Sequence, residues 1–257
     1  MDNALKNDRA GWLQGPPETC SVIPPSVSNP WRLILLGAPG VGKGTQAALL
    51  NQQLHACHLS TGDVFRAAKT RNECDLTPAM KSALDYMRRG DLVPDSTVLE
   101  MVRERGECLR CGGGFILDGF PRTLDQALAL ADLLEAEKLS LTAVINYELP
   151  VSDIVARLGG RLTCGKCKAV FHATERPPKI AGSCDVCQGK LFQREDDRPE
   201  SIRIRLEAYD RSTLPLIQFY KKAGLLLTVA ATGTPQEICA KTLTALHAWR
   251  SRYIASV

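Results

Sequence analysis

The sequence predicts an α/β fold in which a parallel sheet of five strands is flanked by helices, and three observations favour it. Short runs rich in Leu and β-branched residues recur along the chain: WRLILL (31–36), CHLS (57–60), FILD (115–118), AVINYEL (143–149) and LLLTVAA (225–231). The intervals between these runs are long enough for the helical crossovers that parallel neighbours need. A glycine-rich segment also follows the first run directly and precedes a helical pattern, which is the context of a phosphate-binding loop.

Length and composition allow one large domain, or one domain with insertions. The chain has 257 residues, of which 44% are hydrophobic, enough to bury a core. No apolar run reaches the roughly 18 residues of a membrane span, so we expect no membrane partner. A net charge of +4 gives no chain-wide basic field for nucleic acid, but 20 of the 32 basic residues are Arg, which favours small phosphorylated ligands.

Residues 1–30 are predicted to be a flexible tail. They hold five prolines and mixed charges, and they lack the apolar block of a secretory signal. Ten cysteines without such a signal indicate a reducing compartment, so we expect a cytoplasmic protein. In that compartment paired Cys-x-x-Cys motifs bind metal more often than they form disulfides.

The glycine-rich segment GAPGVGKGT, residues 37–45, is the predicted phosphate site. Its glycines let backbone N–H groups turn toward phosphate oxygens, and the start of the following helix adds partial positive charge. Lys43 is expected to reach the outer phosphates. The general pattern has Ser or Thr directly after the Lys, whereas here a glycine intervenes. The predicted ligands from this loop are Gly40, Val41, Gly42, Lys43, Gly44 and Thr45.

Two intervals are longer than a crossover requires, which leaves 31–60, 91–156 and 198–257 as the core. Residues 61–90 contain two helical patterns, the second opened by Thr77 and Pro78 and closed by Gly90. Residues 157–197 show little helical periodicity. A helix is expected to restart at Pro199, and Pro215 is expected to break or kink the helical segment after it.

The second long interval holds a predicted structural metal site. Cys164 and Cys167 are followed, after sixteen residues, by Cys184 and Cys187, a spacing typical of tetrahedral zinc. A segment of about forty residues is too small for a core of its own, so the metal would replace one. Iron, a redox dithiol and ordinary disulfides are the alternatives.

A third Cys-x-x-Cys pair, Cys108 and Cys111, has no second pair nearby in the sequence. A loop that carries two thiols without a metal is the interpretation, and a metal or redox function is the alternative.

The motifs together resemble the adenylate kinase family. Six segments occur in the family's order: GKGT (42–45), LSTGDVFR (59–66), GDLVPD (90–95), LDGFPRTLDQA (117–127), GGRLTC (159–164) and FQREDDRPESIRIRL (192–206). The resemblance covers roughly residues 31–250. It implies Mg²⁺-dependent transfer of a phosphoryl group, ATP + AMP = 2 ADP, a nucleoside monophosphate-binding insertion at 61–90 and a zinc-ribbon-like lid at 157–197.

The resemblance also implies roles for individual residues. Two polyanions must be brought together, so positioning and charge neutralisation dominate the chemistry. The implied catalytic set is Lys43, Arg122, Arg161, Arg194 and Arg205, with Asp118 orienting water around Mg²⁺. The implied AMP site adds Thr61, Arg66, Asp91, Leu92, Val93, Gly119, Phe120, Pro121 and Gln126 to Arg122, Arg194 and Arg205. The implied ATP site adds Arg157, Arg161, Val170, Phe171 and Gly233 to the loop.

Several assignments within this set keep alternatives. Arg203 and Arg205 are two apart on a predicted helix and therefore point to different sides. The resemblance implies that Arg205 is the one that faces the site. Arg203 is then a solvated residue or a partner of Asp196 or Asp197. Asp63 is a second acid near Mg²⁺ or a helix cap. His172 is interpreted as a nucleotide-side or surface residue.

The resemblance places Gln126 where the family reads the adenine of AMP. An amide suits this role because it both donates and accepts hydrogen bonds. Other readings remain open. One is a kinase that takes GTP as the donor or another nucleoside monophosphate as the acceptor. A second, of a different class, is a P-loop ATPase whose zinc ribbon binds nucleic acid, although the ribbon offers only Phe171 and Phe192 as aromatic residues. A monomer is expected.

Overall fold

The computed structural model describes residues 28–68, 76–89, 93–103 and 109–255. The expectations for 1–27, Gly90, Asp91, Leu92 and Cys108 lie outside these ranges. Among the described helices, none has both the length and the apolar character that a membrane crossing requires.

The main sheet has five strands in the order β2-β3-β1-β4-β8, and every neighbouring pair is parallel. The strands are β1 (Trp31–Leu36), β2 (Cys57–Ser60), β3 (Gly114–Asp118), β4 (Ala143–Glu148) and β8 (Leu226–Ala230). Each of the five predicted runs therefore becomes a strand, and the predicted α/β class is confirmed.

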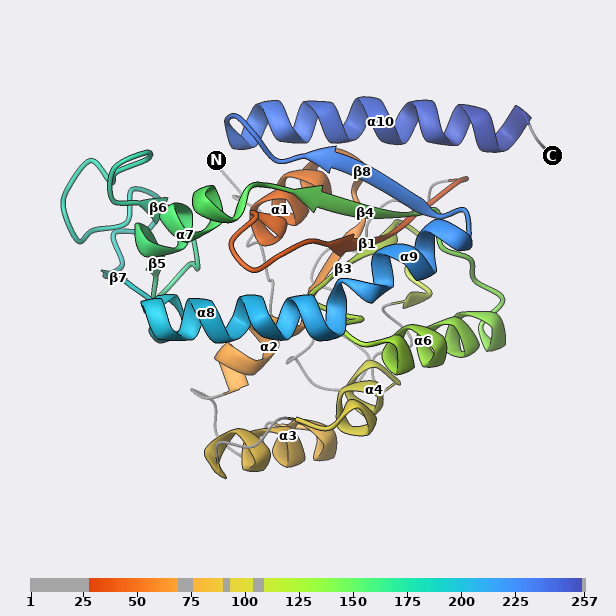
Figure 1. The fold of residues 1–257 in the computed structure, drawn as a ribbon, viewed down its shortest axis with the longest axis horizontal. Coiled ribbons are helices and arrows are strands. Elements are labelled where there is room, and N and C mark those ends of the chain that lie inside the picture. The colour runs from red at the N-terminus through yellow and green to blue at the C-terminus, as the bar shows by residue number, and fades with distance from the viewer. Residues whose placement is uncertain (1–27, 69–75, 90–92, 104–108, 256–257) are drawn as a thin grey trace.

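Helices cover both faces of this sheet (Figure 1). They are α1 (Lys43–Leu54), α2 (Thr61–Ala68), α3 (Pro78–Arg89), α4 (Asp95–Arg103), α6 (Leu124–Ala136), α7 (Val151–Gly159), α8 (Pro199–Ala208), α9 (Pro215–Lys222) and α10 (Pro235–Ala255). Strand β1 explains why both faces need cover. Leu33 and Leu35 pack with α1 and α10, whereas Ile34 and Leu36 pack on the face of α3, α4, α6 and α9. A strand buried on both sides reads as a continuous apolar run, as WRLILL does.

The sheet topology places the ends of β1 and β3 beside each other. The connection after β1 runs toward β2, and the connection after β3 runs toward β4, on the other side of β1. The two loops therefore leave the carboxyl edge of the sheet in opposite directions. Ligands of open α/β sheets bind in the crevice that such a divergence creates.

A second, small antiparallel sheet lies between α7 and α8, to the left of the main sheet in Figure 1. It has the order β6-β5-β7, with β5 (Arg161–Cys164), β6 (Val170–His172) and β7 (Leu191–Phe192). Cys164, Phe171, Cys184 and Leu191 form its buried cluster. We name residues 160–197 the ribbon.

Proline and threonine mark helix boundaries as expected. Thr77 Oγ1 accepts a 3.4 Å hydrogen bond from the backbone N–H of Met80 at the start of α3. Pro199 begins α8, which passes through a π-helical turn, η4 (Tyr209–Thr213), before Pro215 begins α9. The predicted break at Pro215 is thus a local change of winding, with Leu214 N–H donating to Tyr209 O at 2.9 Å.

Candidate active site

The phosphate loop occupies residues 37–42, between β1 and α1. Gly37, Gly40 and Gly42 have φ of 133°, 86° and 106°, a region that favours glycine. A Cβ on Gly40 would also come within 2.6 Å of Leu158 Cγ, because the loop packs closely against α7. The loop thus keeps its backbone close to the last turn of that helix.

Lys43 is the first residue of α1 and reaches back across the loop. Its Nζ donates hydrogen bonds to Gly37 O at 2.6 Å and to Ala38 O at 3.0 Å. Burial lowers the pKa of Lys43 from 10.5 to about 8. Two hydrogen bonds therefore hold the ammonium group in place, while its burial disfavours the charged form.

Four other predicted residues act on this same ammonium group. Burial has the largest effect on the pKa of Lys43. Of the smaller effects, the carboxylate of Asp118 raises this pKa, while the guanidinium groups of Arg122, Arg205 and Arg161 lower it by like-charge repulsion. These residues come from β3, the loop after β3, α8 and β5. Segments far apart in sequence therefore gather one carboxylate and several cations around the phosphate loop.

Asp118 ends β3 at the carboxyl edge of the sheet and is 9% exposed. Its Oδ2 lies 3.4 Å from Nε2 of His58. A Cβ placed on Gly44 would be 3.3 Å from the same oxygen. The carboxylate consequently faces the start of α1, beside the predicted phosphate site.

Residues from three segments meet in the loop after β3. Thr61 Oγ1 donates to Gly119 O at 2.9 Å, and Arg122 Nε donates to the same oxygen at 2.8 Å. Thr213 Oγ1 donates to Arg122 O at 2.9 Å. The bond between the buried Phe120 and Pro121 is cis.

The Gln126 side chain is 4% exposed, and its amide orientation is set by partners at both ends. Its Oε1 accepts from Arg122 N–H at 2.8 Å, and its Nε2 donates to Asp95 Oδ1 at 2.6 Å. Thr123 Oγ1 donates to Asp95 Oδ2 at 2.5 Å. Sequence reasoning missed Asp95, although it closes the quoted motif GDLVPD directly before a helix.

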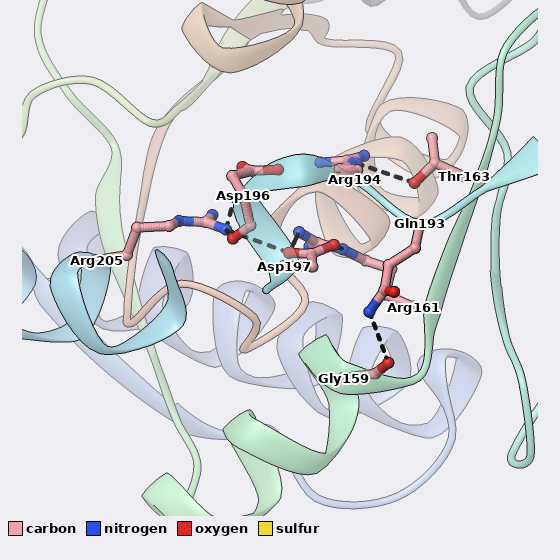
Figure 2. A network of polar contacts seen from close by, with 8 residues as sticks. All are labelled: Gly159, Arg161, Thr163, Gln193, Arg194, Asp196, Asp197 and Arg205. Carbon is pink, nitrogen blue, oxygen red and sulfur yellow. Dashed lines mark hydrogen bonds and ion pairs between the residues drawn. The ribbon is translucent and has the colours of Figure 1, made fainter. Parts of the chain in front are cut away.

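Arginines of the ribbon and of α8 converge on Asp197, whose side chain is 0% exposed (Figure 2). Asp197 belongs to a short 3₁₀ turn, η3 (Glu195–Asp197). Arg161 forms a two-pronged pair with it, with Nε donating to Oδ2 at 2.7 Å and Nη2 donating to Oδ1. Arg205 Nη1 lies 3.3 Å from Asp197 Oδ1 and 3.1 Å from Asp196 Oδ2.

Arg194 is hydrogen-bonded to the small sheet. Its Nε donates to Thr163 Oγ1 at 2.9 Å, across the small sheet (Figure 2). Arg203 points to solvent, with a side chain that is 73% exposed and pairs with Glu207 one turn away. Of the two readings of Arg203, the structure favours the solvated one, because Arg205 takes Asp196 and Asp197.

Arg157 connects the elements expected around the ATP base. Its guanidinium donates to Ala231 O at 3.0 Å and to Val41 O at 3.4 Å, which joins α7 to the phosphate loop and to the end of β8. Gly233, with φ of 103°, follows that end. A Cβ at Gly233 would meet Glu237 Oε2 at 2.5 Å, so the turn packs tightly against the first turn of α10.

Of the ribbon residues assigned to ATP, Phe171 lies inside the ribbon. Phe171 is 7% exposed and packs in the ribbon's own cluster, beside the half-buried Val170. His172 Nδ1 accepts hydrogen bonds from the backbone N–H of Thr174 and Glu175, at 3.3 and 3.0 Å. These bonds are those of a residue that shapes a turn.

Some assigned residues fall where little can be described. Val93 is half-buried and packs against the core beneath α3 and α4. Asp63 and Arg66 lie in α2, and their side chains are outside the described set, as are Asp91 and Leu92 entirely. The roles of these four residues stay predictions.

The four cysteines of the ribbon form one cluster. The Sγ atoms of Cys164, Cys167, Cys184 and Cys187 all lie within 4.8 Å of one another. Two of the pairs are 3.5 Å apart. A tetrahedron of sulfurs about 2.3 Å from a zinc ion has edges of about 3.8 Å, so the spacing suits a metal.

The surroundings of these thiols also suit a metal. Burial raises the pKa of Cys164, but hydrogen bonds from the backbone N–H groups of Cys167 and Lys166 and from the thiols of Cys187 and Cys167 together outweigh it and lower the pKa to about 6. The pKa of Cys167, in contrast, is raised, chiefly by burial. Cys164 therefore loses its proton more readily than Cys167 does. Gly189 lies so close that a Cβ would come within 2.9 Å of Cys164 Sγ. The backbone thus encloses the cluster and donates to its sulfur.

Comparisons with known proteins agree with the geometry. The family model described as "Adenylate kinase" matches residues 35–225. An adenylate kinase of Streptomyces coelicolor is 48% identical over 216 residues, which are 84% of this chain and 98% of that protein. An adenylate kinase of Acidothermus cellulolyticus is 46% identical over 220 residues, 85% of this chain and 99% of that protein. One of Caldicellulosiruptor bescii is 49% identical over 196 residues, 76% and 89% of the two chains.

Proposed function

The chain belongs to the adenylate kinase family, and on that premise we propose that it transfers the terminal phosphoryl group of ATP to AMP, reversibly, to give two ADP. The observation that carries the proposal is the set of charges around Lys43. Asp118, Arg122, Arg161 and Arg205 all act on its ammonium group, although they come from separate segments. Phosphoryl transfer needs such a concentration of cations, because two polyanionic nucleotides must approach each other.

ATP is proposed to bind with its phosphates in the loop of residues 37–42 and against residues 43–45 of α1. The left-handed glycines turn backbone N–H groups inward, and the first turn of α1 adds its partial positive charge. Lys43 already lies across this loop, so little side-chain entropy is lost when a phosphate replaces its carbonyl partners. Arg157, from α7, and Gly233, after β8, would border the adenine base of ATP.

Asp197 is proposed to act as an internal counter-anion while nucleotides are absent. It holds Arg161 by two bonds and approaches Arg205. A phosphoryl group that arrives between these arginines offers three oxygens in place of one carboxylate. The arginines are thus kept in position without a ligand, and Arg194 is proposed to join them when the ribbon closes over ATP.

AMP is proposed to bind between α2, the segment around Val93 and the loop after β3. Gln126 would read the adenine edge, since its amide presents one donor and one acceptor in an orientation that Asp95 and Arg122 N–H fix. Arg122 would bind the AMP phosphate, together with Arg66. Residues 61–90 are proposed to be the insertion that closes over this nucleotide.

Mg²⁺ and zinc are proposed as the two metals. Asp118 faces the start of α1, and Thr45 is the third residue of that helix, so these residues fit an ion that is held mainly by phosphates and water. When bound with ATP, Mg²⁺ neutralises part of the phosphate charge. The four thiolates of the ribbon would hold the zinc ion, which would maintain the ribbon's shape and take no part in the transfer.

A coupled assay of ADP formation tests the proposal. ATP is supplied with AMP, CMP, UMP or GMP in turn, and GTP then replaces ATP as donor, each with and without Mg²⁺. We expect turnover with ATP and AMP to exceed every other pair by at least tenfold and to require Mg²⁺. Equal turnover with another monophosphate would reject AMP as the acceptor. We further propose that the protein is a cytoplasmic monomer. Sedimentation equilibrium, which measures the mass in solution, would test whether it is monomeric.

A further inference from the structure

A second group of thiols lies outside the ribbon, at the amino-terminal edge of the main sheet. Cys57 opens β2, and Cys111 lies in the turn before β3. Cys57 Sγ donates a 3.7 Å hydrogen bond to Cys111 Sγ, across 54 residues of sequence. Both residues are partly exposed, and neither has a part in the phosphate site or the ribbon.

The segment that carries Cys111 is fixed on both sides. Before it, Leu109 is buried, and Arg110 donates two hydrogen bonds to the Glu137 carboxylate at 2.5 and 2.7 Å. After it, Gly114 N–H donates to Cys111 O at 2.9 Å. Gly114 has φ of 85°, and a Cβ there would lie 2.0 Å from a carbonyl oxygen of β1, so the turn cannot shift toward that strand. The sulfur contact therefore joins two anchored segments.

Cys57 is both fixed and accessible. It pairs with Phe115 in the parallel register of β2 and β3. Its side chain packs against the core, but the residue is partly exposed, which leaves a small molecule a path to the sulfur. A disulfide needs the sulfurs to approach to about 2.05 Å, and these two sulfurs are already 3.7 Å apart.

We propose that Cys57 and Cys111 form a reversible disulfide when the protein meets a low-molecular-weight disulfide oxidant. The thiolate of one cysteine attacks the oxidant, forms a mixed disulfide and releases one small thiol. The second cysteine attacks the protein sulfur of that mixed disulfide and releases the other small thiol. Two protein thiols lose two electrons to one small disulfide, and their two protons end on the two thiols released.

The cross-link would join the two ends of the segment that carries α2, α3 and α4. This segment leaves the sheet after β2 and returns before β3, and the proposed AMP-binding insertion lies within it. The sulfurs lie at the start of β2, three residues or roughly 10 Å from the strand end that faces the nucleotides. The disulfide should thus restrain unfolding of the segment and leave the nucleotide sites unchanged.

The test maps the disulfide in the full-length, zinc-loaded protein. The protein is incubated with oxidised glutathione, alkylated, digested with trypsin without reduction and analysed by mass spectrometry. Trypsin cleaves after Arg110, which separates Cys108 from Cys111. We expect peptide 44–66 linked to peptide 111–122, with the link lost after reduction. No link, or a link from peptide 106–110 to either partner in its place, would overturn the proposal.

Variants supply the second readout. Oxidation should raise the melting temperature by roughly 5–10 °C in the parent and in the control Cys239→Ala, and by less than about 1 °C in Cys57→Ser or Cys111→Ser. Zinc per chain should be the same in all four proteins. A second zinc ion that disappears in Cys57→Ser would assign these thiols to a metal and overturn the disulfide. None of these readouts depends on kinase activity.

Discussion

Nucleotide binding should be accompanied by uptake of a proton at Lys43. Burial, joined by the repulsion from the neighbouring arginines and opposed by the attraction of Asp118, lowers the pKa of this residue to about 8. Phosphate oxygens placed against Nζ contribute the opposite charge and therefore raise the pKa toward its ordinary value or above. Below that raised pKa, the complex holds a fully protonated Lys43.

The pKa fixes the size of the uptake. With a pKa of about 8, Lys43 lacks its proton in about one tenth of unliganded molecules at pH 7.0, about half at pH 8.0 and about three quarters at pH 8.5. Binding should restore these fractions. The expected uptake thus increases from about 0.1 to about 0.75 proton per chain over that range.

Isothermal titration calorimetry measures this uptake. ATP is titrated into the protein at each pH in buffers of different ionisation enthalpy, and the slope of apparent binding enthalpy against ionisation enthalpy gives the number of protons. Lys43→Arg is the matched control, because a guanidinium stays charged throughout and takes up no proton. An uptake that is equal at pH 7.0 and 8.5, or that persists in Lys43→Arg, would refute the reasoning.

Four further predictions concern stability. Lys43 has a pKa of about 8 in the folded, unliganded protein and about 10.5 in the unfolded chain, so it destabilises the fold below pH 8, and this cost in free energy declines as the pH rises. The difference in unfolding free energy between the parent and Lys43→Met, measured by urea denaturation, should therefore shrink from pH 7.5 to 9.5. A difference that stays constant over this range would contradict the prediction. Asp197→Ala leaves Arg161 and Arg205 without their buried carboxylate and should cost about 3 kcal/mol, or roughly 6–12 °C of melting temperature in calorimetry, whereas a loss below 2 °C would argue against the network. Cys164→Ser with Cys167→Ser should lower zinc measured by emission spectrometry from about one to less than about 0.1 per chain and lower the melting temperature, with residual turnover at low temperature; unchanged zinc content would refute the metal site. Gly40→Ala adds a clash with Leu158 to left-handed strain and should destabilise the protein more than Gly182→Ala, which has the strain without a described atom within 4 Å of the new Cβ; equal effects in thermal melts would show that the loop can yield.

Local sequence patterns were sufficient for the sheet, the phosphate loop and the thiol cluster. A strand such as WRLILL is recognisable because both of its faces are apolar, and GAPGVGKGT because glycines must occupy left-handed conformations at fixed positions. The four cysteines were recognisable because short Cys-x-x-Cys spacing is itself the geometry of a metal knuckle. In each case neighbours in sequence determine the structure.

Pairings between distant residues were not predictable in this way. Arg161 and Asp197 are 36 residues apart, and Asp95 and Gln126 are 31 apart, so no local period relates them. The strands of the ribbon were also missed, since β7 has only two residues and depends on pairing with β5. The same holds for Cys57 and Cys111, whose contact exists only because β2 and β3 are neighbours in the sheet.

The central claim is that arginines gathered around Lys43 make phosphoryl transfer between two anions possible. The most direct test compares kcat/KM for ADP formation from ATP and AMP in Arg122→Ala with that in Arg203→Ala, whose guanidinium is exposed on α8 and pairs with Glu207. Arg122→Ala should lose on the order of 10³ in kcat/KM at an unchanged melting temperature, and Arg203→Ala less than about twofold. Similar kcat/KM values in the two variants would contradict the claim.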